Sequence, residues 1–210
     1  MRITWLGHAC FRLSSGGYSV VVDPYEPDRV PGYGSMTAEA DAVYCSHGHG
    51  DHNYVQAVTL KDSGNTPMEA EKVPSFHDDR QGTLRGENTI HVFYDGETRA
   101  VHLGDLGHLL SPEQLKVIGK PDVLMIPVGG FFTIGPDDAV KVIDQLQPRV
   151  VIPMHYRLGD LGYDEIGLLD EFLDKCDYAP VVRYGGNSID VVPSTPKQTA
   201  VLTFERKEKC

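Results

Sequence analysis

The segment His47-Gly48-His49-Gly50-Asp51-His52 places three imidazole rings and one carboxylate within six residues. Neutral imidazole nitrogens and carboxylate oxygens are the ligands that zinc, iron or manganese prefer in proteins. We expect Gly48 and Gly50 to form a tight loop, because glycine accepts backbone angles that a side chain would forbid. Such crowding has little structural use, although a solvated histidine-rich loop is the alternative. The segment therefore predicts a metal-binding loop.

The spacing within this segment predicts two neighbouring ions. On extended backbone, residues two positions apart point to the same side, so His47 and His49 would face one ion. Asp51 and His52 start a new direction and would face a second ion.

Apolar and β-branched runs indicate where the strands lie. The runs occupy residues 3–6, 18–22, 42–45, 90–93, 100–103, 123–128, 150–154, 181–184 and 189–192. Helical patterns are fewer and are interleaved with strands in both halves of the chain. This arrangement predicts an α/β fold in which helices cover sheets, rather than an all-β barrel.

The clearest helix begins after Ser111, which can cap it, with Pro112 in the first turn and Gln114 as a capping-box partner. Further helices are expected over residues 136–147 and 164–173, with a short one over residues 51–60. Two stretches rich in proline, glycine and acidic residues are expected to be surface loops, residues 25–40 and 61–72.

Length and composition limit the class of protein. A chain of 210 residues fits a single domain, residues 1–210, with one core. Its apolar runs are far shorter than the ~20 residues that cross a bilayer. The amino terminus enters a strand pattern directly, without the features of a secretory signal. We therefore expect a cytoplasmic protein in which Cys10, Cys45, Cys176 and Cys210 are free thiols.

The formal net charge is −11, which argues against a nucleic-acid partner because such binding depends on clustered lysine and arginine. A small-molecule substrate is expected instead. An anionic substrate stays open, because bound cations would make the site locally positive. The sequence also leaves the oligomeric state open, a homo-oligomer included.

Further ligands are expected at other strand ends, because α/β folds gather their sites outside the carboxyl edges of the strands. Asp105 and His155 follow the predicted strands 100–103 and 150–154, and His77 follows the segment Val73-Pro74-Ser75-Phe76. His8 and Asp23 share this position, each directly after a strand.

The order of these residues resembles the motifs of the metallo-β-lactamase superfamily: Asp23, then His47-x-His49-x-Asp51-His52, His77, Asp105 and His155. Three further segments make the chain similar to a subgroup of small metal-dependent hydrolases: Trp5-Leu6-Gly7-His8-Ala9, Gly86-Glu87-Asn88 and Gly104-Asp105-Leu106-Gly107. This subgroup is akin to ascorbate-6-phosphate lactonase and to the catalytic core of N-acyl phosphatidylethanolamine phospholipase D. The resemblance covers about residues 3–189.

The resemblance implies a four-layer αββα sandwich with two central sheets. It also implies two divalent metal ions, with zinc expected and manganese or iron as alternatives. One ion would be held by His47, His49 and His77, and the other by Asp51, His52 and His155. Asp105 would bridge the two ions. The chain lacks a large nuclease-type insertion, which argues against RNA processing.

The mechanism that follows from this site is hydrolysis of a small ester, lactone or phosphodiester. Two cations about 3.5–4 Å apart lower the pKa of a bridging water toward ~7, so the nucleophile would be a hydroxide. Asp51 would orient the hydroxide, and His8 would be a proton source or a buried, hydrogen-bonded histidine. The alternatives are a di-iron redox protein of the same fold and a non-catalytic metal-binding protein.

The remaining candidates have weaker signals. Asp23 is expected to brace a metal ligand or to cap a turn. Arg157 could pair with a phosphate or carboxylate. The other candidates are open between a site role and ordinary structure, with structure favoured for the histidines: His91, His102, His108, Tyr156, Phe131 and Phe132.

Overall fold

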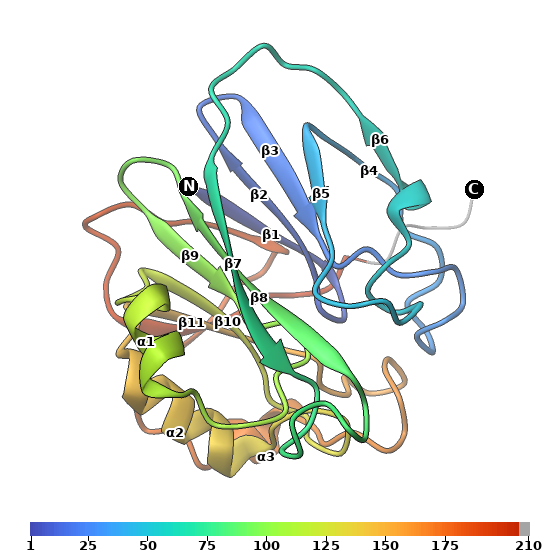
Figure 1. Cartoon of the computed structure of the whole chain (residues 1–210), viewed down its shortest axis with the longest axis vertical. Helices are drawn as coiled ribbons and strands as arrows, with labels where there is room; N and C mark the ends of the chain where they lie inside the picture. Colours follow the sequence, from blue (N-terminus) through green and yellow to red (C-terminus); the bar gives the residue numbers. More distant parts are fainter. Residues whose placement is uncertain (206–210) are drawn as a thin grey trace.

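Two β-sheets face each other across one hydrophobic core in the computed structural model, which describes residues 1–205 (Figure 1). The first sheet has the order β13-β1-β2-β3-β5, with β13 Ser188–Asp190, β1 Arg2–Gly7, β2 Cys10–Ser15, β3 Tyr18–Val22 and β5 Ala42–Tyr44. The second sheet has the order β12-β14-β11-β10-β9-β8-β7. Its strands are β12 Val181–Arg183, β14 Gln198–Val201, β11 Val150–Met154, β10 Val123–Pro127, β9 Arg99–His102, β8 Glu87–Tyr94 and β7 Glu69–Phe76.

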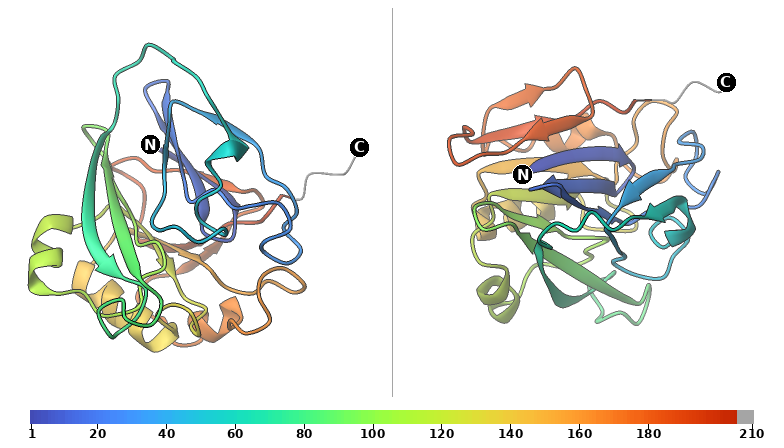
Figure 2. Two further views of the ribbon diagram at one scale, coloured as in Figure 1. Left: turned by 45° about the vertical axis from the view of Figure 1, so that its right-hand side comes forward. Right: turned by 90° about the horizontal axis from the view of Figure 1, so that it is seen from above.

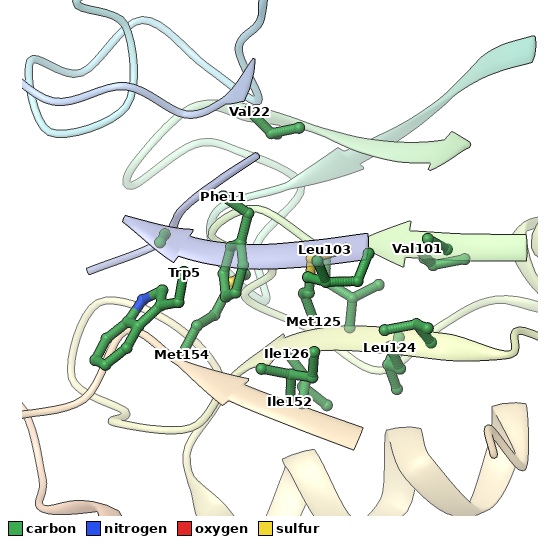
Figure 3. Packing of buried hydrophobic residues seen from close by; sticks show 14 of the residues in the cluster. Trp5, Phe11, Val22, Val101, Leu103, Leu124, Met125, Ile126, Ile152 and Met154 are labelled. Carbon is green, nitrogen blue, oxygen red and sulfur yellow. The ribbon is translucent and has the colours of Figure 1, made fainter. Parts of the chain in front are cut away.

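The core lies where the inner faces of these two sheets meet. Ile3 and Trp5 of β1 point inward at alternate positions, as the two-residue period of a strand requires. Figure 3 shows side chains of both sheets in this core, among them Trp5 of β1, Phe11 of β2, Met125 of β10 and Met154 of β11. All five residues of β10 and of β11 are buried, because these parallel strands are covered on both faces.

All three α-helices within the described residues lie on the side of the seven-stranded sheet that faces away from the other sheet (Figures 1 and 2). They are α1 Pro112–Ile118, α2 Pro136–Leu146 and α3 Leu169–Leu173. The α/β class and the two facing sheets are confirmed. Within residues 1–205, α-helices cover the outer face of the seven-stranded sheet and not that of the five-stranded sheet. A two-stranded sheet of β4 Ala38–Ala40 and β6 Val58–Leu60 lies beside β3.

Sequence patterns explain the two longer helices. Helix α2 buries Ala139, Val142, Ile143 and Leu146, which recur at three- and four-residue spacing. The predicted capping box of α1 is confirmed, since Gln114 N–H donates to Ser111 Oγ at 3.2 Å and Ser111 N–H donates to Gln114 Oε1 at 2.9 Å.

Three predictions of local structure are wrong or only partly right. The short helix expected over residues 51–60 is a 3₁₀ turn, η1 Val55–Ala57, followed by strand β6. The segment contains β-branched Val55, Val58 and Thr59, which favour extended backbone. The loops expected over residues 25–40 and 61–72 are interrupted by β4 and by the first half of β7. The third helix covers only the second half of its predicted span.

Strand directions bring the site together. In the seven-stranded sheet, β7 and β9 are both antiparallel to β8, and β9, β10 and β11 are parallel, so β7, β9 and β11 end at the same edge. In the five-stranded sheet, β1 and β3 are both antiparallel to β2, and β5 is parallel to β3. The candidate ligands and Asp23 follow three strands of each sheet, as the sequence predicted: β1, β3 and β5 in the first, and β7, β9 and β11 in the second.

Cys10, Cys45 and Cys176 are free, as predicted, whereas Cys210 and the predicted domain end at residues 206–210 lie outside the described residues. Within residues 1–205, none of the helices has the length and apolar character needed to span a membrane. The predicted cytoplasmic location and oligomeric state stay predictions.

Candidate metal centre

The loop after β5 and the segment after β7 bring three imidazoles together. His47, His49 and His77 each offer a ring nitrogen, and these nitrogens lie within 4.8 Å of one another. The ring centroids of His47 and His49 are 4.6 Å apart, and those of His47 and His77 are 4.9 Å apart. His77 is buried, and His49 is exposed to the cavity described below. This group has the composition of a three-histidine metal site.

A second group lies next to the first and contains His8, Asp51, His52 and His155, with all four residues buried. The Oδ2 atom of Asp51 is 3.6 Å from His8 Nε2 and 3.7 Å from His52 Nε2. His8 and His155 have ring centroids 4.2 Å apart. The sequence had placed His8 at the same strand edge, and the structure brings it within ligand distance of the predicted ligands.

The carboxylate of Asp105 lies between the two groups. Its Oδ2 atom is 3.0 Å from His77 Nε2 in the first group and 3.3 Å from His155 Nε2 in the second. Its Oδ1 atom is 3.2 Å from His52 Nε2. A single carboxylate therefore faces both sets of imidazoles, which is the position required of a bridging ligand.

Several buried polar atoms of the centre have no hydrogen-bond partner within the described residues, among them His47 Nε2, His52 Nε2 and Asp105 Oδ1. Buried polar atoms are otherwise almost always paired, because an unpaired one costs about 1–3 kcal/mol. His52 Nε2 and Asp105 Oδ1 are 3.2 Å apart and still lack hydrogen-bond geometry. Atoms that converge without bonding to one another fit ligands arranged around a cation. The donor set of imidazoles and carboxylates fits divalent metal ions.

Burial and neighbouring charges set the protonation of this centre. Burial, with the nearby His52, lowers the pKa of His47 to about 3, which keeps the imidazole neutral and able to bind a cation. Burial alone would raise the pKa of Asp105, but His155 and His52 hold it well below its usual value. The centre therefore combines an ionised Asp105 with a neutral His47. The carboxylates of Asp105 and Asp23 act in the opposite direction on His52 and raise its pKa, although burial opposes this.

Left-handed backbone occurs at three residues that follow strands, His8 (φ 50°), Asp23 (φ 52°) and His155 (φ 53°). Histidine and aspartate adopt this conformation more readily than most residues, although it stores strain. The predicted need for glycine angles at Gly48 and Gly50 is wrong, because neither has a positive φ. The chain turns its ligands inward at the strand ends and not at the glycines of the loop.

Asp23 supports the centre from behind. Its Oδ2 accepts a hydrogen bond from His52 Nδ1 at 2.8 Å and one from Ser46 Oγ at 2.7 Å, while its Oδ1 accepts from Ser46 N–H at 2.6 Å. Ser46 Oγ also lies 2.9 Å from His47 Nδ1. Asp23 thus braces one ligand directly and a second one through Ser46, in agreement with the expected bracing role.

Asn88 holds the Asp105 loop. Its Oδ1 accepts from Asp105 N–H at 2.9 Å, and its Nδ2 donates to Leu103 O at 2.9 Å and to Ser75 Oγ at 2.7 Å. All of these atoms are buried. Asn88 was part of a motif noted in the sequence, but its bracing role required the tertiary structure.

Other sequence candidates lie away from the centre. His91 Nε2 contacts Cys45 O at 3.1 Å and His102 Nε2 contacts Ala9 O at 2.8 Å, so both are structural, as favoured. Phe76 N–H donates to His108 Nε2 at 3.1 Å, outside the metal groups. Arg157 pairs with Asp164 at 3.7 Å instead of facing the site.

A cavity of about 410 Å³ opens on the centre. It is lined by Arg29, His49, Asp51, His77, Leu84, Arg85, Asp105, Phe132, His155 and Tyr163. Phe132 thus belongs to a pocket wall, one of its two predicted roles. Sequence reasoning missed Tyr163, whose hydroxyl donates to Asp51 Oδ2 at 3.3 Å. No local pattern marks Tyr163, because it reaches the site from a loop 112 residues away.

The chain is similar to known proteins over most of its length. A family model described as beta-lactamase superfamily domain matches residues 2–155. A relative from Methylobacterium nodulans, named UPF0173 metal-dependent hydrolase, is 31% identical, with 91% of this chain and 100% of the relative covered. A relative of the same name from Methanopyrus kandleri is 29% identical, with 74% and 84% covered.

The fold also matches a solved structure. The crystal structure of a proposed Zn-dependent hydrolase of the metallo-β-lactamase superfamily from Thermotoga maritima is 32% identical and gives a TM-score of 0.70. The match covers 96% of this chain and 98% of that chain. The narrower resemblance to ascorbate-6-phosphate lactonase and to the phospholipase D core stays a prediction.

Proposed function

Because this chain belongs to the metallo-β-lactamase superfamily and is a metal-dependent hydrolase, we propose that it hydrolyses a small ester, lactone or phosphodiester at a binuclear site. The proposed ligands are His47, His49 and His77 for one ion, Asp51, His52 and His155 for the other, and Asp105 for both. The observation that carries the proposal is the Asp105 carboxylate, which contacts both groups of imidazoles.

Zinc is the metal we propose for both positions. When bound, two divalent ions supply an acidified water as nucleophile and polarise the scissile bond. The imidazole-rich first group suits zinc, copper, nickel or iron better than magnesium or calcium, which prefer oxygen ligands.

Asp51 is the residue we propose to orient the nucleophile. Burial would raise its pKa, but the contact with His8 and the neighbouring His52 hold the pKa well below its usual value. The carboxylate is therefore ionised and can act only as a hydrogen-bond acceptor. Asp51 also lines the cavity. It can therefore accept a hydrogen bond from a water molecule there and contact a substrate.

His8 is proposed as a positioning residue for Asp51. It is fully buried, is not among the cavity residues, and has its Nε2 atom 3.6 Å from Asp51 Oδ2. Burial and the nearby His155 lower its pKa to about 4, so the imidazole is neutral at pH 7. Neither ring nitrogen of His8 has a hydrogen-bond partner within residues 1–205, so the proposed positioning role rests on the packing of the ring beside Asp51. The position of His8 outside the cavity argues against the predicted donation of a proton to the leaving group.

The test combines metal analysis with an activity screen. Protein loaded with zinc is assayed with esters, lactones and phosphodiesters, beside the variants D105A and D79N. Asp79 is an exposed carboxylate close in sequence to the centre and serves as the matched control. We expect two ions per chain and hydrolysis for the wild type and D79N, and loss of metal with at least a hundredfold lower turnover for D105A.

Unchanged metal content and hydrolysis in D105A would contradict the proposed site. Full metal occupancy without hydrolysis of any probe would favour a non-catalytic metal-binding protein. Bound iron together with oxygen consumption would favour the di-iron redox alternative.

A further inference from the structure

Two arginines line the same cavity as the metal centre. Arg29 comes from the loop after β3, and Arg85 comes from the loop between β7 and β8. They share the cavity with the candidate ligands and with the apolar side chains of Leu84 and Phe132. Neither arginine was among the candidate site residues predicted from the sequence.

Neither guanidinium group has an acidic partner within residues 1–205. Five other arginines pair with an aspartate in this part of the chain: Arg2, Arg80, Arg149, Arg157 and Arg183. Arg157, which the sequence offered as a possible anion partner, is among them, with its Nη1 atom 3.7 Å from Asp164 Oδ1. The cations that remain available for a ligand at the cavity are Arg29 and Arg85.

Arg85 is held in place without using up its charge. Its Nη2 donates to Phe131 O at 2.9 Å, and its guanidinium carbon lies 5.9 Å from the centroid of the Phe132 ring. Guanidinium has five N–H donors in a fixed planar arrangement, so most of them stay free after this one bond. A planar cation packed on an aromatic ring can donate two hydrogen bonds to the oxygens of a carboxylate or phosphate.

Arg29 is fixed through its backbone. Its N–H donates to Glu26 O at 3.2 Å, and its carbonyl oxygen accepts from the Tyr163 hydroxyl at 3.3 Å. The same hydroxyl also lies 3.3 Å from Asp51 Oδ2 and shares its one proton between the two acceptors, which connects the Arg29 loop to the metal centre. The side chain of Arg29 is exposed, so its attraction for an anion is screened by salt.

The walls between the arginines and the centre are partly apolar. Leu84 is 59% exposed although it is a large aliphatic residue, and Phe131, next to Phe132, is 62% exposed. Leu84 and Phe132 line the cavity, so a ligand there can bury apolar groups against them. Polar groups within such a site then fix the orientation of that ligand.

We propose that the substrate carries an oxyanion, a carboxylate or a phosphate, that is separated from the scissile bond by an apolar segment. Arg29 and Arg85 bind the oxyanion, Leu84 and Phe132 contact the apolar segment, and the scissile bond lies at the metal centre. This inference rests on the proposed hydrolytic function for the position of the scissile bond. The binding of the oxyanion can be measured without turnover.

The test measures binding of three matched ligands to metal-loaded protein by isothermal titration calorimetry. 4-Phenylbutyrate and 3-phenylpropyl phosphate present two oxyanions on the same phenylpropyl group, and 4-phenylbutanamide is the neutral counterpart. The variants are R29Q, R85Q and R85K, with R183Q as control because Arg183 is an exposed arginine of β12 outside the cavity.

We expect R29Q and R85Q each to weaken binding of the oxyanions about three- to tenfold, which is typical of a partly exposed charge-assisted hydrogen bond. Binding of the amide and binding by R183Q should be unchanged, and R85K should retain part of the affinity. The ratio between the carboxylate and the phosphate identifies which oxyanion the site prefers.

The inference is overturned if the arginine variants bind the oxyanions as tightly as the wild type, or if they lose the amide equally. An anion that binds only to the metals would give the first result. These outcomes are independent of turnover, so they differ from failure of the hydrolytic proposal, which is absence of hydrolysis at full metal occupancy.

If the protein hydrolyses esters, a kinetic measurement also separates binding of the oxyanion from binding of the apolar segment. Mono-4-nitrophenyl glutarate and 4-nitrophenyl pentanoate share a five-carbon acyl chain and differ in a terminal carboxylate. R85Q should raise KM for the glutarate ester about three- to tenfold, with little change for the pentanoate ester. Equal KM changes for both esters would contradict a role in anion binding.

Discussion

The Nδ1–H group of His52 donates a hydrogen bond to Asp23 Oδ2 across 2.8 Å, and both side chains are fully buried. The bond fixes the tautomer of His52 and leaves Nε2 free to face Asp105 and Asp51. Burial would raise the pKa of Asp23, but His52 holds it well below its usual value. A carboxylate that stays ionised behind an imidazole orients that imidazole and increases its basicity as a ligand.

Replacement of Asp23 by asparagine is expected to weaken metal binding at the His52 position about 10- to 100-fold. Asparagine tolerates the left-handed backbone at this residue (φ 52°), so the change removes mainly the charge. Competition with a chelating dye measures the affinity. The control is D41N, because Asp41 also accepts backbone and hydroxyl hydrogen bonds but lies outside the metal groups. Equal affinities for D23N and the wild type would refute the bracing role.

Replacement of Asn88 by alanine removes one acceptor and two donor contacts around the Asp105 loop. Because the buried Asp105 N–H and Leu103 O then lose their partner, we expect the free energy of unfolding to fall by about 1–3 kcal/mol. Urea unfolding of metal-free protein measures this loss. N65A, which removes only exposed contacts, should change stability by less than about 0.5 kcal/mol. A change in N88A no larger than in N65A would contradict the prediction.

The glycines of the two ligand loops should respond differently to alanine. Gly104 has φ 56°, and a Cβ atom there would overlap Asn88 Oδ1 and Ser46 Cβ. We expect G104A to lower the free energy of unfolding by about 2 kcal/mol or more and to displace Asp105. Gly48 has no positive φ and no atom within 4 Å of an added Cβ, so G48A should be within about 0.5 kcal/mol of the wild type. A larger loss in G48A than in G104A would reverse this assignment.

Asp78 should make stability depend on pH in the acid range. Its carboxylate accepts backbone N–H groups from Arg80, Gly82, Leu84 and Arg85 in the turn after His77. Burial opposes ionisation, but these hydrogen bonds lower the pKa of Asp78 to about 2. Since an unfolded chain has an aspartate pKa near ~3.9, the stabilisation is present above about pH 4 and is lost as the pH falls toward 2.

D78N should therefore unfold at a lower temperature than the wild type at pH 7, by an expected ~5 °C. The difference in Tm should shrink as the pH is lowered from 4 toward 2. Thermal unfolding followed by circular dichroism measures the Tm difference at each pH. Metal-free protein is used so that loss of metal at His77 does not contribute to the difference. A difference in Tm that stays constant across this range would show that the charge of Asp78 is not responsible.

The sequence was most informative where chemistry is concentrated in short segments. The His47 to His52 segment and the residues after the strands predicted the seven candidate ligands, and the structure brings all seven into two adjoining groups around Asp105. Strand ends could be recognised because apolar, β-branched runs stop abruptly before a polar residue. Parallel strands then collect these residues at one edge, which follows from fold class alone.

Strands without a strong apolar run were missed. β2 and β14 contain polar residues at several positions, and β6 has two exposed residues of three, so their pairing with neighbours decides their structure. The short helix expected after Asp51 failed for the same reason. Its backbone groups pair instead with β4, which lies about twenty residues earlier in the chain.

The amino-acid sequence by itself determined the fold class and the candidate ligands, because ligand types and strand periodicity are properties of local sequence. Only the tertiary structure decided that Asp23 braces His52, that Asn88 holds Asp105, and that Arg29, Arg85 and Tyr163 share one cavity. These residues belong to segments far apart in the chain. Their contacts depend on how the two sheets pack, and no local sequence pattern encodes contacts between segments so far apart in the chain.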